Sequence, residues 1–234
     1  MHETNKLITV ALISAAIISL ITSAAFMFIF SLEEEVPYEK GIDSTVSITA
    51  YSENEELSTA TGFALSHNGV KILTNAHAVM QTDSEAYVDL RLRDVRGNEC
   101  QAEVLHVDQK NDIAILGMKT NELDLHPLSL SSSSLEYGQK VFISSNARGY
   151  GISVQDGIIS IPSLVISSDG LEKQSIQTTI PLNKGSSGAP LIDENGNVVG
   201  MMSFRMRDES GNIVQGLSYA IPSSLLTNAL KNVT

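Results

Sequence analysis

The sequence has a single cysteine, Cys100, and no tryptophan among its 234 residues. One cysteine cannot form an intramolecular disulfide, so a small secreted scaffold held by disulfides is excluded, and a hydrophobic core has to stabilise the fold. Cys100 follows the turn-like segment Gly97-Asn98-Glu99 and begins an expected strand. We therefore predict a structural role for Cys100 rather than a nucleophilic one.

Basic residues are also scarce: the chain has 15 Lys and Arg and 27 Asp and Glu, which gives a formal charge of -12. With no basic stretch to neutralise phosphates, we expect no nucleic-acid partner. The five histidines, at positions 2, 67, 77, 106 and 126, include no close pair, and one cysteine cannot make a structural zinc site. We expect neither a metal nor an organic cofactor.

One long apolar run, residues 7–30, contains no charged residue. At 1.5 Å per residue it covers the roughly 30 Å of bilayer hydrocarbon, which predicts one transmembrane helix over 7–30 after a short N-terminus, 1–6. A cleavable signal peptide is the alternative, because residues 23–25 (Ser-Ala-Ala) resemble a cleavage site, but the apolar run continues past them. Lys6 before the run and Glu33 to Glu35 after it indicate a cytoplasmic N-terminus and an extracytoplasmic domain, on the periplasmic or extracellular side.

Residues 31–41 are acidic and contain proline, which predicts a linker to a single domain over 42–234. In that domain, period-two alternation over 45–51 and 87–92 and apolar runs over 112–118, 140–143 and 213–221 indicate strands. Short turn signals such as Asn68-Gly69 separate them. Only 223–232, after Pro222, is typical of a helix. The pattern predicts an all-β barrel or sandwich.

A candidate nucleophile, Ser187, lies in the segment Gly185-Ser186-Ser187-Gly188. Glycines let backbone N–H groups converge on one point without obstruction by a Cβ atom. The N–H groups of this loop could bind a developing oxyanion, at about 3 kcal/mol per donor, and we take Gly185, Ser186 and Ser187 as the oxyanion-hole residues. The Gly-Ser string alone is weak support, because most such loops do no chemistry.

Two other segments supply the partners that a serine nucleophile needs. His77 directly follows an apolar strand, and Asp112 stands at the head of another. A serine hydroxyl requires a base to take its proton, and the imidazole requires a carboxylate to fix its tautomer. His77 could instead be a core histidine and Asp112 a turn cap. The rival carboxylates are Asp89, Asp94 and Asp108.

Together these segments resemble the chymotrypsin-fold (trypsin-like) serine proteases, specifically the HtrA/Deg branch. The matching motifs span about 44–232 and lie at 61–77, 111–116, 177–190 and 216–222. The resemblance implies two six-stranded antiparallel β-barrels and a C-terminal helix, with His77 and Asp112 on the first barrel and Ser187 on the second. It also implies a homotrimer, although the peptide-binding PDZ domain common in the branch is not expected here.

Three residues near Ser187 depart from the branch pattern. Lys184, Ser186 and Ala189 stand where Pro, Asn and Gly are usual, and they could alter how the oxyanion loop settles. Ala189 also means that Ser187 does not complete the Gly-x-Ser-x-Gly elbow of α/β-hydrolases.

The same resemblance implies a substrate pocket without a carboxylate, which predicts cleavage after small or medium apolar residues, because a buried substrate cation would stay unpaired. The residues implied to line it are Pro181, Leu182, Ser203, Phe204, Gly216 and Ser218.

We therefore predict a membrane-tethered serine endopeptidase that acts on unfolded or misfolded polypeptides at the outer face of a membrane. The alternatives are a catalytically weak or inactive protease-fold module that binds or senses peptides, motivated by Lys184 and Ala189, and a general esterase that uses the same nucleophile.

Overall fold

The structure is a computed structural model that describes residues 6, 12–24, 37–52, 55–82, 85–87, 89–168, 171–207 and 213–233. The chain divides into two units, Met1–Val36 and Pro37–Thr234. Residues 12–24 are helical, and the remainder of the predicted transmembrane segment, 7–11 and 25–30, lies outside the described residues. Within the described ranges no helix is both long and apolar enough to cross a membrane. The membrane anchor stays a prediction.

The first half of the larger unit is a closed six-stranded barrel with strand order β1-β2-β3-β6-β5-β4, as predicted. Alternation in sequence becomes alternation in burial: in β5, Cys100 and Ala102 face the core while Glu99, Gln101 and Glu103 are exposed. The strands are β1 (Thr45–Ser52), β2 (Glu55–Ser66), β3 (Val70–Thr74), β4 (Asp89–Arg93), β5 (Glu99–Asp108) and β6 (Ile113–Met118).

The second half is a sheet with strand order β11-β8-β9-β10-β13-β12-β7, and β11 also pairs with β12. Six antiparallel strands therefore form a closed ring of pairings, while β7 adds in parallel to β12. The prediction of six strands in this half missed β7, whose two residues are too few for alternation to show. The strands are β7 (Ser129–Leu130), β8 (Lys140–Ser145), β9 (Ser153–Ser168), β10 (Leu171–Thr178), β11 (Pro190–Asp193), β12 (Asn197–Arg207) and β13 (Ile213–Pro222).

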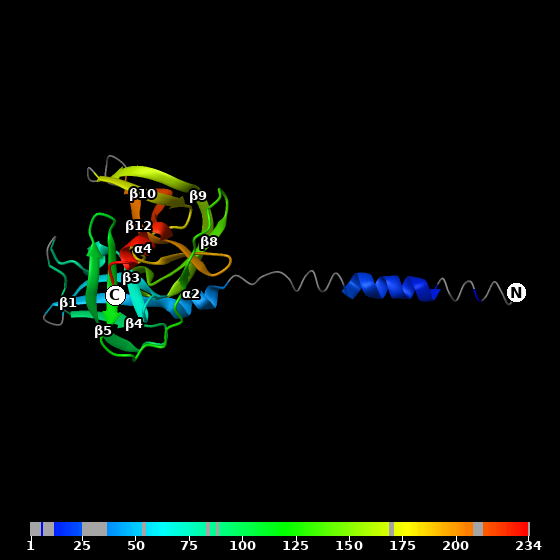
Figure 1. The fold of residues 1–234 in the computed structure, drawn as a ribbon, viewed down its shortest axis with the longest axis horizontal. Coiled ribbons are helices and arrows are strands. Elements are labelled where there is room, and N and C mark those ends of the chain that lie inside the picture. The colour runs from blue at the N-terminus through cyan, green and yellow to red at the C-terminus, as the bar shows by residue number, and fades with distance from the viewer. Residues whose placement is uncertain are drawn as a thin grey trace. The chain divides into compact units, whose positions relative to one another are not determined.

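The two halves lie side by side, the first barrel in light blue to green and the second sheet in green to orange-red (Figure 1). Each has its own hydrophobic core, the first around fully buried residues such as Ile72 and Leu116, the second around Ile143 and Leu191. Full burial of such a side chain contributes about 1.5–3 kcal/mol. The predicted C-terminal helix is confirmed as α4 (Ser223–Leu230), which contacts β12 and β13 of the second sheet and β6 of the first barrel.

A short helix, α2 (Tyr38–Ser44), occupies the end of the segment expected to be a linker. Residues 37–41 therefore belong to the compact unit, because the Tyr38 ring packs edge-on against Phe142, with centroids 4.9 Å apart, and Gly41 is buried. Residues 31–36 lie outside the described residues.

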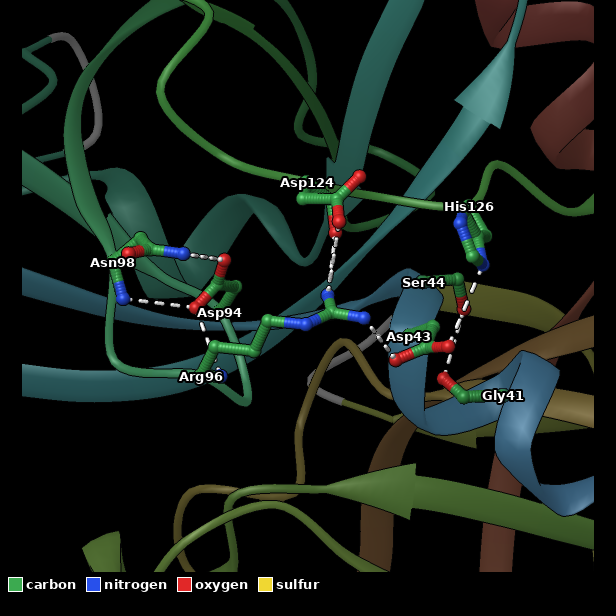
Figure 2. A network of polar contacts seen from close by, with 8 residues as sticks. All are labelled: Gly41, Asp43, Ser44, Asp94, Arg96, Asn98, Asp124 and His126. Carbon is green, nitrogen blue, oxygen red and sulfur yellow. Dashed lines mark hydrogen bonds and ion pairs between the residues drawn. The ribbon is translucent and has the colours of Figure 1, made fainter.

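A polar network joins the C-terminal end of α2 to two loops of the first barrel (Figure 2). One carboxylate oxygen of Asp43 lies 3.4 Å from the Arg96 guanidinium, and the other lies 3.4 Å from Nδ1 of His126. Arg96 also donates to the Asp124 carbonyl at 3.0 Å. The neighbouring Asp94 carboxylate accepts the N–H groups of Arg96 and Asn98 and so closes the turn between β4 and β5.

Candidate active site

His77 is presented to solvent by a short turn of helix at the end of β3. The strand ends at Thr74, Asn75 is still extended (ψ 148°), and α3 (Ala76–Val79) follows. Because the other three residues of α3 are buried, the helix is fixed to the barrel while the His77 side chain stays 55% exposed.

Asp112, directly before β6, binds two nitrogen atoms of this histidine. Its Oδ1 accepts the His77 backbone N–H at 3.1 Å and lies 2.9 Å from Nδ1. A carboxylate only accepts, so Nδ1 carries the proton and Nε2 is left as the basic nitrogen. Asp112 adopts a left-handed backbone (φ +57°), which Asp tolerates better than most residues. The side-chain amide of Asn75 donates to the Asp112 carbonyl at 3.1 Å and stabilises that turn.

A third contact comes from the other half of the molecule. Ser203, a buried residue of β12, donates from Oγ to Asp112 Oδ2 at 2.7 Å. Burial of the carboxylate disfavours its charge, but the hydrogen bonds from His77 and Ser203 and the attraction of His77 outweigh burial and lower the pKa of Asp112. Asp112 is therefore ionised at neutral pH. The sequence suggested Ser203 only as a substrate contact, because no local pattern reveals which carboxylate a distant strand will meet.

The rival carboxylates have other partners. Asp89 forms a salt bridge with Arg91 at 2.8 Å, and Asp108 accepts from the side chain of Asn111 at 2.6 Å. Asp94 belongs to the turn between β4 and β5. Of the four candidates, Asp112 is the one that contacts His77.

Ser187 lies in the loop before β11, and its backbone is fixed to the first barrel. The Ser187 carbonyl accepts the N–H of Thr61 from β2 at 3.0 Å. Gly188 has φ +85°, and a Cβ there would lie 2.1 Å from the Thr61 carbonyl oxygen, so only glycine fits. The Ser187 hydroxyl donates to the Ser203 carbonyl at 3.3 Å, and no hydrogen bond joins it to His77 in the part of the chain that is described.

The loop before the candidate nucleophile, Ser187, is also held by hydrogen bonds on both sides. The Lys184 carbonyl accepts the N–H of Arg148 at 2.8 Å, and the Gly185 carbonyl accepts the Thr61 hydroxyl at 2.6 Å. Gly185 has φ +90° and a Cβ there would lie 2.6 Å from the Asn146 carbonyl oxygen. The N–H groups of Gly185 and Ser187 have no hydrogen-bond partner among the described residues.

His77 and Ser187 line one open cleft of about 410 Å³ together with Gly185, Lys184 and residues of β2. Three of the residues expected in the substrate pocket also line it: Leu182, Ser203 and Phe204. The other three lie outside its lining. Pro181 and Gly216 are exposed elsewhere, and the Ser218 hydroxyl contacts the Leu182 N–H at 3.2 Å from behind.

Two residues singled out in the loop face away from this cleft. The Ser186 side chain is fully buried against the Ser145 hydroxyl at 3.1 Å, and its N–H already donates to the Asn183 carbonyl. The N–H of Ser186 is therefore unavailable to an oxyanion. Ala189 packs in the core of the second sheet, so its departure from the branch pattern adds a methyl group to the core and not to the cleft.

Comparison with known proteins gives one consistent result. Residues 60–201 match the profile of the trypsin-like peptidase domain. A probable periplasmic serine endoprotease DegP-like from Halomonas elongata is 36% identical over 168 residues, which cover 72% of this chain and 33% of that protein. Serine endoprotease DegS from Haemophilus influenzae is 29% identical over 191 residues, covering 80% of this chain and 54% of the relative. The chain thus spans about a third to a half of the length of these relatives.

Solved structures agree on the fold. The protease Rv3671c from M. tuberculosis, in an inactive form, superposes with a TM-score of 0.70 and covers 85% of this chain and 93% of its own. At 19% sequence identity this likeness concerns the fold alone.

Proposed function

Because the chain belongs to the trypsin-like peptidase family, with DegP-like and DegS endoproteases among its relatives, we propose that it is a serine endopeptidase with His77, Asp112 and Ser187 as its catalytic triad. The observation that carries the proposal is the His77–Asp112 pair, 2.9 Å between Nδ1 and Oδ1, in the same cleft as Ser187. It brings a polarised base to the wall of the cleft that holds the nucleophile.

The proposed reaction begins with a rotation of the Ser187 side chain. Its hydroxyl leaves the weak 3.3 Å bond to the Ser203 carbonyl and turns toward Nε2 of His77 when substrate fills the cleft. Catalytic hydrogen bonds often form fully only in the substrate complex. His77 takes the proton as Oγ attacks the scissile carbonyl, and ionised Asp112 stabilises the imidazolium. His77 then gives the proton to the leaving amine, and water hydrolyses the acyl-enzyme by the same steps.

In this mechanism the oxyanion hole consists of the backbone N–H groups of Gly185 and Ser187. Both residues line the cleft and neither N–H has a partner among the residues that the structure describes. Preorganised donors of this kind are each worth about 3 kcal/mol of transition-state stabilisation. Ser186, with its N–H engaged, has a structural role.

For the substrate we propose unfolded polypeptide, cleaved after small or medium apolar residues. No carboxylate lies among the described residues that line the cleft, so a basic side chain would find no partner there, whereas Leu182 and Phe204 offer apolar surface. Cleavage of casein with no cleavage of folded proteins, and sequencing of the product ends, test this proposal. Hydrolysis of simple esters without cleavage of casein favours a general esterase.

A fluorophosphonate probe tests the nucleophile. We expect it to label the folded wild-type protein and Ser186→Ala but not Ser187→Ala. Ser186 is a matched control because it is adjacent in sequence and its hydroxyl is buried. The Ser187 contact to Ser203, in place of His77, is the observation that favours the alternative, a protease-fold module that binds peptides without cleaving them. Folded wild-type protein that resists the probe supports that alternative.

For location we propose an extracytoplasmic domain on a single membrane anchor. The names of the DegP-like relatives include the word periplasmic, and residues 7–30 carry no charge. Membrane fractionation combined with digestion of intact and permeabilised cells tests both points. Assembly as a homotrimer remains a prediction that light scattering can check.

A further inference from the structure

Lys184 is an exposed cation on the wall of the catalytic cleft. Two hydrogen bonds fix the backbone around Lys184. The Lys184 carbonyl accepts the Arg148 N–H at 2.8 Å, and the Gly185 carbonyl accepts the Thr61 hydroxyl at 2.6 Å. Its ammonium group makes no hydrogen bond or ion pair with any described residue. The charge is therefore held at the cleft without a partner of its own.

The described residues that line the cleft include a basic side chain but no acidic one. Of the described residues that line it, only Lys184 and His77 have titratable acid or base groups, and none is a carboxylate. Asp112 lies behind His77 and is occupied by His77 and Ser203. The whole chain carries a formal charge of -12, so the cleft differs in sign from the chain as a whole.

We infer that Lys184 is a specificity-determining residue that selects peptides with an Asp or Glu side chain within two residues of the scissile bond. This inference rests on the proposed endopeptidase function. Lys184 directly precedes Gly185, whose N–H would lie about 3 Å from the scissile carbonyl oxygen. Consecutive Cα atoms of a peptide are about 3.8 Å apart, so the flexible four-carbon stem of lysine reaches the side chains flanking that bond.

The expected preference is modest because the ion pair forms near solvent. An exposed ion pair typically stabilises a complex enough to raise kcat/KM for the acidic peptide by about two- to fivefold at low salt. Salt screens such pairs within about 10 Å at 0.1 M, so the preference falls as NaCl is added. Without Lys184 the negative charge of the rest of the chain disfavours the same acidic peptides.

The test uses pairs of fluorogenic peptides that are identical except for Glu or Gln at one position flanking the cleaved bond. For each protein the readout is the ratio of kcat/KM for the Glu peptide to that for the Gln peptide, which cancels any general loss from disturbing the loop. We expect a ratio of about two to five for wild type, a similar ratio for Lys184→Arg, a ratio near or below one for Lys184→Met, and a clear preference for Gln in Lys184→Glu. Lys231→Met, which removes the same charge beside a different groove, should match wild type.

The inference is overturned by a wild-type ratio of one, or by a ratio above one that persists in Lys184→Met. In both cases the peptides are still cleaved, so the proposed endopeptidase function stands. If no peptide is cleaved and a fluorophosphonate fails to label the folded protein, both proposals fail together. The two failures are therefore distinguishable.

Discussion

Replacement of Asp112 by asparagine should separate catalysis from folding. The aspartate accepts the N–H and Nδ1–H of His77 on one oxygen and the Ser203 hydroxyl on the other. An asparagine can keep the first two bonds through its oxygen, and its NH₂ group can donate to Ser203, whose hydroxyl also accepts. What is lost is the negative charge that stabilises the imidazolium.

The expected magnitudes differ accordingly. Replacement of the aspartate of a triad by asparagine lowers the turnover rate by about 10⁴-fold, or about 5 kcal/mol of transition-state stabilisation. Exchange of charged for neutral hydrogen bonds should lower the free energy of unfolding by only about 1–3 kcal/mol. Peptide hydrolysis and urea unfolding of the same preparation measure both quantities.

Asp108→Asn is the matched control for this experiment. Asp108 is the rival carboxylate nearest in sequence, it accepts hydrogen bonds from the N–H and side chain of Asn111, and it does not contact His77. We expect kcat/KM within about twofold of wild type, since Asp108 lies outside the proposed triad. The reasoning is refuted if Asp112→Asn keeps activity within tenfold of wild type, or if Asp108→Asn loses as much.

Three further outcomes follow from the structure. Gly188→Ala should be strongly destabilised in urea, because the new methyl group would meet the Thr61 carbonyl oxygen at 2.1 Å with φ at +85°; a change below about 1 kcal/mol contradicts this. Burial raises the pKa of Asp112, but its hydrogen bonds and the attraction of His77 outweigh burial and lower it from 3.8. The contribution of the Asp112 charge to the stability difference between wild type and Asp112→Asn should therefore shrink as the pH falls below about 3.8, and a difference that grows there contradicts the sign. Burial, with smaller effects from nearby acids, raises the pKa of the Cys100 thiol, so iodoacetamide should alkylate Cys100 slowly in the native protein and rapidly in urea; fast native labelling contradicts the buried position.

Strands with strict alternation or long apolar runs were predictable from the sequence. The expected strand over 45–51 is β1, that over 112–118 is β6, and that over 213–221 is β13. Asn68-Gly69 forms the predicted turn because both residues adopt positive φ, at 47° and 95°. These features depend on neighbours in the chain, which a sequence displays directly.

Features that depend on distant contacts were not predictable. Helix α2 follows Pro37 and contains acidic residues, a composition typical of a linker, but Tyr38 packs against Phe142, more than a hundred residues away. Likewise, the sequence assigned Ser186 to the oxyanion hole, because composition does not show that its side chain is buried against Ser145 and that its N–H binds the Asn183 carbonyl. The contact from Ser203 to Asp112 also joins the two halves of the molecule, and no local pattern encodes it.

The attachment of the nucleophile loop to Thr61 has a consequence for biosynthesis. Thr61 belongs to β2, which leaves the ribosome well before Ser187, and it binds the carbonyls of both Gly185 and Ser187. The shape of the loop therefore depends on contacts with a folded first barrel. A nascent or half-unfolded chain would carry all three residues of the proposed triad and still lack these contacts. Under the proposed function, proteolytic activity therefore requires both halves of the molecule to be folded.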